Sequence, residues 1–249
     1  MIIIKSKREI ELMKEAGRVV ALVFEGIKDK IVPGISTQDV ADMCEKIIRD
    51  NGATPTFLNY YGYPGAVCVS VNDELVHGIP SKKRILRDGD IVSVDVGATL
   101  NGYVGDACRT YPVGICKENA LRLIKVTEQS FFEGVKYARP GAHLGDISHA
   151  IQKYCEAHGY SLPREYTGHG VGSVLHEDPY IPNYGAAGTG PILKEGMTLA
   201  IEPMVAEGHF AVRVLKDGWT AKMKDGKLSS HYENSIVITK DGYEILTKI

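Results

Sequence analysis

The chain has 249 residues, of which 44% are apolar and 24% charged, and these values suit one globular domain with a substantial core. Its formal net charge is only −2 and it has no long run of lysine or arginine, so neither a nucleic acid nor a membrane surface is the expected main partner. No signal peptide or membrane-spanning window is recognisable, and five cysteines without a CxxC pair indicate free thiols in a cytoplasmic protein, without disulfides or structural zinc.

Two amphipathic helices are predicted at the start of the chain. Ser6 and Glu9 form a capping-box pattern, after which apolar residues recur every three or four positions, so the first helix should run to about Pro33. Ser36 should begin a second helix that ends near Asn51-Gly52. Similar helices are predicted over residues 118–138 and 143–158.

After each helix pair the apolar period falls to two residues, which is typical of strands. The clearest strands are predicted over residues 67–71, 91–99, 198–205 and 234–239. Strands that follow helices favour an α+β fold, in which helices cover an antiparallel sheet.

The chain also resembles itself at an offset of 107 residues. Leu86–Asp95 is echoed by Leu193–Glu202, and Asp39 is paired with Asp146. Two copies are too few for a solenoid, so we expect a pseudo-twofold repeat within one domain. That single domain would span residues 1–249, with halves of about 1–112 and 113–249.

Two aspartates are placed together by a predicted hairpin. Asn101-Gly102 is a strong signal for a two-residue turn, and it would pair Asp95 with Cys108 and Asp106 with Gly97. The two aspartates then share one face of the sheet as diagonal neighbours. Acidic residues in a hairpin are often solvated, but Asp95 lies in an apolar run, where an unpaired carboxylate would be costly. We therefore expect the pair to bind a cation.

Three further residues extend this candidate metal site. Glu202 follows the apolar run of the second half, and Glu233 precedes the last predicted strand. His169 is flanked by glycines that leave its ring uncovered, although alone it would more often be a loop histidine. Four carboxylates and one imidazole suit manganese, iron, cobalt or zinc. Five ligands exceed the needs of one ion, so we expect two divalent ions in an arrangement used for hydrolysis.

At this point the sequence resembles the type I methionine aminopeptidases, which have the pita-bread fold. The resemblance covers nearly the whole chain, and its motifs are Gly105-Asp106, Gly168–Gly172, His176–Pro179 and Ile201–Met204. The type II branch would have a serine after His169 and a long insertion before Glu202. Ala107-Cys108 stands where small hydroxyl residues are usual, but neither is a ligand.

The resemblance implies a hydrolase, a metalloprotease that removes the initiator methionine from nascent polypeptides and prefers a small second residue. Its metal ligands would be Asp95, Asp106, His169, Glu202 and Glu233. Glu202 would also be the general base that takes a proton from the attacking water. His176 would stabilise the tetrahedral oxyanion, and His77 would contact the scissile amide.

The same resemblance assigns a methionine pocket and a second ion site. The pocket would be lined by Tyr60, Tyr63, Cys68 and Trp219, with Phe57 and Leu175 at less certain positions. The alternative is that these apolar residues are simply core. Cys68 would be a pocket wall, because nothing nearby resembles a base that could activate it. Asn72 and Ser229 would contribute to a monovalent-cation site. His143, His149, His158 and His209 have no motif context and are expected to be surface residues.

Two alternative functions remain. A proline-specific peptidase of the same fold has similar ligands, but usually carries an additional N-terminal domain, and here the helix-helix-sheet repeat begins within the first ten residues. A pita-bread protein without catalysis could serve as a binding module, although all five ligands are retained. The expected partners are peptides and nascent chains with N-terminal methionine, met at the ribosome, and the expected state is a monomer.

Overall fold

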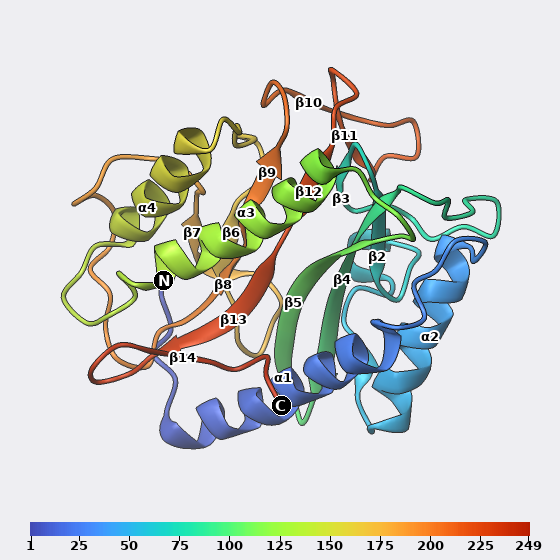
Figure 1. Cartoon of the computed structure of the whole chain (residues 1–249). Helices are drawn as coiled ribbons and strands as arrows, with labels where there is room; N and C mark the ends of the chain where they lie inside the picture. The colour runs from blue at the N-terminus through green and yellow to red at the C-terminus, as the bar shows by residue number, and fades with distance from the viewer.

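In the computed structural model, which describes residues 1–249, a curved sheet lies at the centre of the molecule (Figure 1). Its nine strands are β1 (Thr54–Pro55), β2 (Cys68–Val71), β4 (Ile91–Leu100), β5 (Tyr103–Pro112), β6 (Gly168–Gly170), β7 (Glu177–Ile181), β8 (Thr198–Ile201), β13 (Glu233–Ile238) and β14 (Tyr243–Ile245). The strands run β1-β4-β5-β13-β8-β6-β7, with β2 beside β4 and β14 beside β13. Every pair is antiparallel.

Two smaller sheets complete the β-structure. One contains β10 (Val212–Val214), β11 (Ala221–Met223) and β3 (Glu74–Val76), and the other pairs β12 (Ser229–His231) with β9 (Met204–Ala206). The predicted strand over residues 198–205 is therefore two strands, β8 and β9, in different sheets. The break lies at Glu202-Pro203, because proline has no N–H to continue the ladder.

Four helices pack on the sheet: α1 (Lys7–Ile27), α2 (Thr37–Asp50), α3 (Glu118–Val135) and α4 (Leu144–Ala157). Asp39 and Asp146, the pair predicted from the repeat, both occupy the third position of a capping box, in α2 and α4. The first helix ends six residues before the predicted Pro33. Ile31 lies beyond the end of the helix but is still buried. The apolar spacing therefore continues past the last helical residue. No helix is long and apolar enough to cross a membrane.

The hairpin of β4 and β5 has the predicted register. Asp95 faces Cys108 and Gly97 faces Asp106, and Asn101-Gly102 forms the turn with φ of 52° and 80°. Helix α1 crosses this hairpin closely at Gly105, where an added Cβ would lie 2.6 Å from the backbone nitrogen of Gly17. The α+β arrangement of helices on an antiparallel sheet is thus confirmed.

Alternation along the strands separates core from site. Val92, Val94 and Val96 of β4 pack with α1 and α2 in one hydrophobic cluster. Because successive side chains point to opposite faces, Asp95 points away from these helices. Leu199 and Ile201 of β8 likewise pack with α3 and α4. The helices therefore cover one face of the sheet, and the acidic residues project from the other.

Candidate active site

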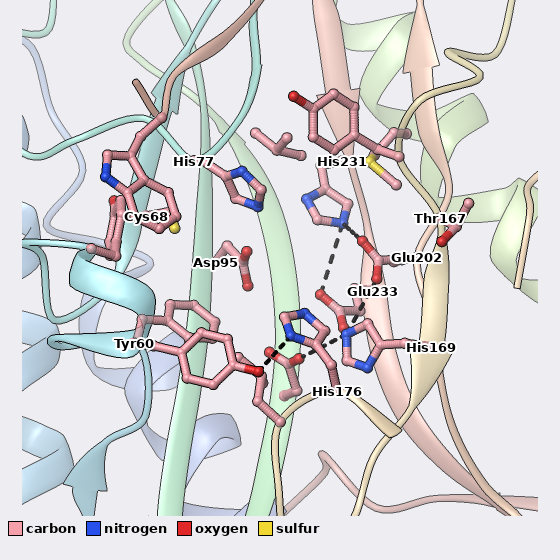
Figure 2. Close-up of a pocket in the computed structure, with 18 of the residues that line it drawn as sticks. Tyr60, Cys68, His77, Asp95, Thr167, His169, His176, Glu202, His231 and Glu233 are labelled. Atoms are coloured by element: carbon pink, nitrogen blue, oxygen red, sulfur yellow. Dashed lines mark hydrogen bonds and ion pairs between the residues drawn. The ribbon is translucent and has the colours of Figure 1, made fainter. Parts of the chain in front are cut away.

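A cavity of about 540 Å³ opens on the face of the sheet opposite the helices (Figure 2). All five predicted ligands and both motif histidines line it, as do all six predicted pocket residues. The four histidines expected at the surface do not line it, and neither do Asn72 and Ser229. Residues from both halves of the sequence therefore meet in one cavity.

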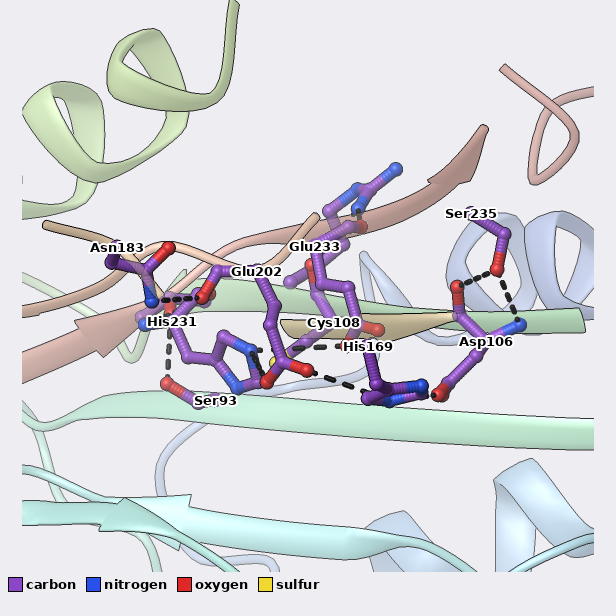
Figure 3. A network of polar contacts seen from close by, with 11 residues as sticks. Ser93, Asp106, Cys108, His169, Asn183, Glu202, His231, Glu233 and Ser235 are labelled. Carbon is purple, nitrogen blue, oxygen red and sulfur yellow. Dashed lines mark hydrogen bonds and ion pairs between the residues drawn. The ribbon is translucent and has the colours of Figure 1, made fainter. Parts of the chain in front are cut away.

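His169 lies between two carboxylates at the floor of this cavity (Figure 3). Its Nε2 atom is 3.5 Å from Oδ2 of Asp106 and 3.5 Å from Oε1 of Glu202. Asp106, Glu233 and His169 are buried, and one ligand atom from each lies within 4.8 Å of the others. This spacing is that of side chains that can share one ion.

Three of the carboxylates each have one oxygen without a hydrogen-bond partner. Oδ1 of Asp95, Oδ1 of Asp106 and Oε1 of Glu233 are buried without a hydrogen bond. Burial and the neighbouring charges of Asp106 and Glu202 raise the pKa of Asp95 well above its usual value, and burial with the same neighbours raises the pKa of Glu233. Buried charges of one sign require compensation, and oxygen-rich sets with an imidazole suit divalent cations. The residues therefore fit a divalent-metal site.

The raised pKa of His169 also indicates that this cluster attracts positive charge. Burial alone would lower its pKa, but the polar contact with Asp106 and the charges of Glu202 and Asp106 outweigh it and raise the pKa to about 9. Nδ1 of His169 lies 2.9 Å from the carbonyl oxygen of Gly170 and can donate to it, which leaves Nε2 facing the carboxylates. A metal ligand is commonly oriented by such a bond.

The other two motif histidines stay neutral near pH 7. Burial and the nearby His231 and His176 lower the pKa of His77 to about 4. Burial and the neighbouring His169 lower the pKa of His176 to about 4 as well. The hydroxyl of Tyr60 lies 2.9 Å from Nδ1 of His176, as the dashed line in Figure 2 shows. Both rings can therefore donate an N–H without carrying a charge.

The predicted methionine pocket forms a mainly apolar side of the cavity. Tyr63 packs edge-on against Trp219, with ring centroids 5.2 Å apart, and its hydroxyl donates to the carbonyl of Gly78 at 2.9 Å. Burial, reinforced by the charge of Asp95, raises the pKa of the Cys68 thiol well above its ordinary value. A thiol held protonated is a poor nucleophile, in agreement with its expected place as a wall.

Asn72 and Ser229 are neighbours outside the cavity. The backbone N–H and the hydroxyl of Ser229 both donate to the carbonyl oxygen of Asn72, at 2.9 and 3.2 Å. The side chain of Asn72 donates to Asp90 and accepts from the backbone of Ile91. The two residues are thus brought together, while their side-chain polar groups already have protein partners.

His231 lines the cavity although the sequence reasoning gave it no role. It is only 2% exposed, and its Nε2 atom lies 3.5 Å from Oε2 of Glu202. The signal that could have found it is its position two residues before Glu233, since residues two apart share a face in extended chain. Tyr61, Tyr166, Thr167 and Met204 also line the cavity without having been predicted.

Comparison with known proteins agrees with this geometry. The model of metallopeptidase family M24 matches residues 11–240. Methionine aminopeptidase 1 of Bacillus subtilis is 53% identical over 249 residues, which is all of both chains. The crystal structure of methionine aminopeptidase from Thermotoga maritima has a TM-score of 0.99 and 50% identity, with both chains fully covered.

A prolidase from Pyrococcus furiosus is more distant. It superposes with a TM-score of 0.80 at 27% identity and covers 99% of this chain, but only 66% of the prolidase chain is matched. The shared architecture identifies the pita-bread fold predicted from the sequence motifs. The methionine aminopeptidases have both the higher sequence identity to this chain and the more complete coverage.

Proposed function

We propose that this chain, which belongs to metallopeptidase family M24 and removes the N-terminal methionine from peptides, works through the five-residue ligand set and two divalent ions. The observation that carries this proposal is one cavity in which His169 lies beside Asp106 and Glu202 and in which three buried carboxylate oxygens have no hydrogen-bond partner. Such ions lower the pKa of a water molecule and polarise the scissile carbonyl when they are bound. Cobalt, manganese, iron and zinc all suit the ligand set.

Glu202 is the proposed general base. Its carboxylate reaches into the cavity from the end of β8, and its backbone carbonyl accepts a hydrogen bond from the side chain of Asn183 at 2.9 Å. A fixed backbone holds the carboxylate within reach of a water that attacks the scissile carbonyl. Glu202 would take the proton of that water and pass it to the departing amine.

His176 is the proposed oxyanion donor, and Tyr60 its positioning residue. If the Tyr60 hydroxyl donates to Nδ1, the proton of the neutral ring must be on Nε2, where it can face the developing negative charge. His77 is the proposed partner of the scissile amide. Since both rings are neutral near pH 7, neither adds a positive charge beside the ions.

Tyr60→Phe is expected to lower kcat by about fivefold and to change KM less. The substitution keeps the ring but removes one hydrogen bond, which contributes on the order of 1 kcal/mol. Steady-state kinetics on a Met-Ala-Ser peptide measures both constants. Tyr61→Phe is the matched control, since the exposed Tyr61 makes no hydrogen bond through its hydroxyl. Equal effects of the two substitutions would contradict the positioning role.

The apolar side of the cavity is the proposed site for the methionine side chain. Tyr63, Cys68 and Trp219 offer a buried surface without a free charge, which suits a flexible, polarizable thioether. Phe57 and Leu175 belong to the same hydrophobic cluster. We propose that this surface selects methionine at the first position of the peptide.

A small second residue should be preferred, because the ligands, His77 and His176 crowd the space beside the scissile bond. We expect kcat/KM for a Met-Ala peptide to exceed that for an otherwise identical Met-Leu peptide by at least about tenfold. Competition between the two peptides in one reaction gives this ratio directly. Equal cleavage would refute the preference.

The activity itself is tested with chelator-stripped protein and added manganese, iron, cobalt or zinc. Metal-dependent release of methionine from Met-Ala-Ser, without cleavage of Xaa-Pro peptides, is the expected result, and the series ranks the ions. Cleavage before proline would instead favour the prolidase activity. Bound metal without any cleavage would favour a binding module.

The setting of the reaction follows from the substrate. We propose that the chain acts in the cytoplasm as a monomer on nascent chains, at the ribosome. We also propose that residues 1–249 form one catalytic domain with pseudo-symmetric halves of about 1–112 and 113–249. A monovalent cation near Asn72 and Ser229 remains part of this proposal.

A further inference from the structure

His231 has a buried imidazole nitrogen with no hydrogen-bond partner. Only 2% of the residue is exposed, and its Nε2 atom lies inside the cavity beside two carboxylates. Figure 2 shows the ring directed toward Glu202 and Glu233. A buried polar atom without a partner is rare in folded proteins and calls for a physical explanation.

The distances indicate a shared ion better than a hydrogen bond. Nε2 of His231 is 3.5 Å from Oε2 of Glu202 and 3.8 Å from Oε2 of Glu233. N–H···O hydrogen bonds lie between about 2.7 and 3.2 Å. Two ligands at about 2.1 Å from one ion, at an angle near that of a tetrahedron or somewhat wider, lie about 3.4 to 3.8 Å apart.

His169 provides an internal standard for this spacing. Its Nε2 atom is 3.5 Å from Oε1 of Glu202, and the corresponding distance from His231 to Oε2 is also 3.5 Å. The two oxygens of Glu202 therefore face different imidazoles. One ligand atom each from Glu202, His231 and Glu233 lies within 4.8 Å of the others, in a cluster that shares Glu233 with the cluster of His169 and Asp106.

The backbone of His231 is fixed on both sides. Its N–H donates to Oγ1 of Thr110 at 3.1 Å, and the Thr110 hydroxyl lies 2.8 Å from its carbonyl oxygen. The residue also pairs with Met204 across β12 and β9. A ligand held in this way loses little freedom when it binds an ion, so the cluster is organised in advance.

We propose that Glu202, His231 and Glu233 form a further divalent-cation site, in which Nε2 of His231 is a ligand outside the five-residue set. The inference rests on the proposed function, because it shares Glu202 and Glu233 with the proposed metal centre. Two carboxylates and one imidazole suit the same borderline ions and leave positions open for water. The proposed ligand of this site is a free divalent metal ion, and no peptide is needed for it to bind.

Cobalt(II) tests the proposal without any measurement of activity. The chelator-stripped full chain is titrated with cobalt(II) by calorimetry, and proton NMR then counts the hyperfine-shifted, exchangeable N–H signals of metal-bound imidazoles. The wild-type chain should give two such signals, from His169 and His231. His231→Gln and His231→Asn should each give one signal, and the affinity of one binding step should fall by at least about tenfold.

Two other variants make the outcome decisive. His209→Gln alters an exposed histidine that does not line the cavity, and it should behave as the wild type. His169→Gln should lose the other signal. If His169→Gln loses its signal while the His231 variants match the wild type, the further site is wrong and the proposed metal centre stands. If none of the histidine variants alters cobalt binding, the proposed metal centre fails as well.

The wild-type signal count remains informative even if a variant does not fold, which circular dichroism would reveal. A single imidazole signal from the fully loaded wild-type chain would overturn the proposal. His231 would then be a hydrogen-bond partner of Glu202, which a small movement of the ring would bring into range.

Discussion

Glu202→Gln is expected to lower kcat by about 10²- to 10⁴-fold while peptide binding changes far less, the range that general acid–base catalysis contributes. The substitution keeps the size of the side chain but removes the basic oxygen and one negative charge among the ligands. Both are needed mainly in the transition state, so the loss should appear in kcat rather than in ground-state affinity. Single-turnover kinetics on Met-Ala-Ser, with metal in excess, measures the chemical step.

The metal content of the variant separates the two parts of this effect. If Glu202→Gln binds the ions as the wild type does, the loss of rate belongs to the missing base. Glu195→Gln is the matched control, because it removes an exposed carboxylate in the loop before β8. A Glu202→Gln chain with normal kcat would exclude Glu202 as the base.

The acidic part of the site was predictable because its signals are local. A two-residue turn fixes the register of β4 and β5, so the relation between Asp95 and Asp106 follows from counting. Alternation then decides which residues leave the core, and Val94 and Asp95 point to opposite faces as expected. The internal repeat then predicts that Glu202 occupies, in the second half of the chain, the position that Asp95 occupies in the first half.

The element boundaries were less accessible. The apolar period of α1 continued to Ile31, although the helix ends at Ile27, because a buried residue in a turn satisfies the same spacing as a helical one. The apolar pattern after Thr198 predicts one strand that continues through Glu202, although the chain changes sheets there. Short strands such as β12 and β14 carry too few residues for a period to be recognised.

The position of His231 two residues before Glu233 is a local signal, but its proximity to Glu202 depends on contacts between distant parts of the chain. Its partner across the sheet is Met204, and its carboxylate neighbour Glu202 is 29 positions earlier in the chain. The loop positions of the cavity are similar, since His77 and Tyr61 have left-handed φ of 59° and 48° that propensity does not predict. Such conformations persist where the surrounding fold fixes them.

The cavity concentrates charged side chains on one face of the sheet. Asp95 and Glu233 have pKa values raised above those of free carboxyl groups, and His169 has a raised pKa because it lies among them. Without a bound cation, protons are the only positive charges that can enter this cluster. The stability of the metal-free protein should therefore depend on pH in a way that the loaded protein does not.

Metal-free protein is expected to lose stability as pH rises from 6.5 to 9. His169 has a pKa of about 9 in the folded state and 6.5 as its ordinary value, so the folded state binds more protons between these limits. The free energy of unfolding then falls with pH, because its slope has the sign of the protons bound in the unfolded state minus those bound in the folded state. A shift of about 2.5 pKa units corresponds to a loss on the order of 3 kcal/mol.

The other groups do not reverse this sign. The raised pKa values of Asp95 and Glu233 act in the same direction, whereas His77 and His176, lowered to about 4, change stability mainly below pH 6.5. Urea unfolding of chelator-stripped protein at pH 6.5, 7.5 and 9 measures the slope. Cobalt-loaded protein should lack most of it, and metal-free His169→Gln should lack the part that comes from the imidazole, because an imidazole that binds an ion, or is absent, takes up no proton. A metal-free wild type as stable at pH 9 as at 6.5 would show that the carboxylates do not hold the proton on His169.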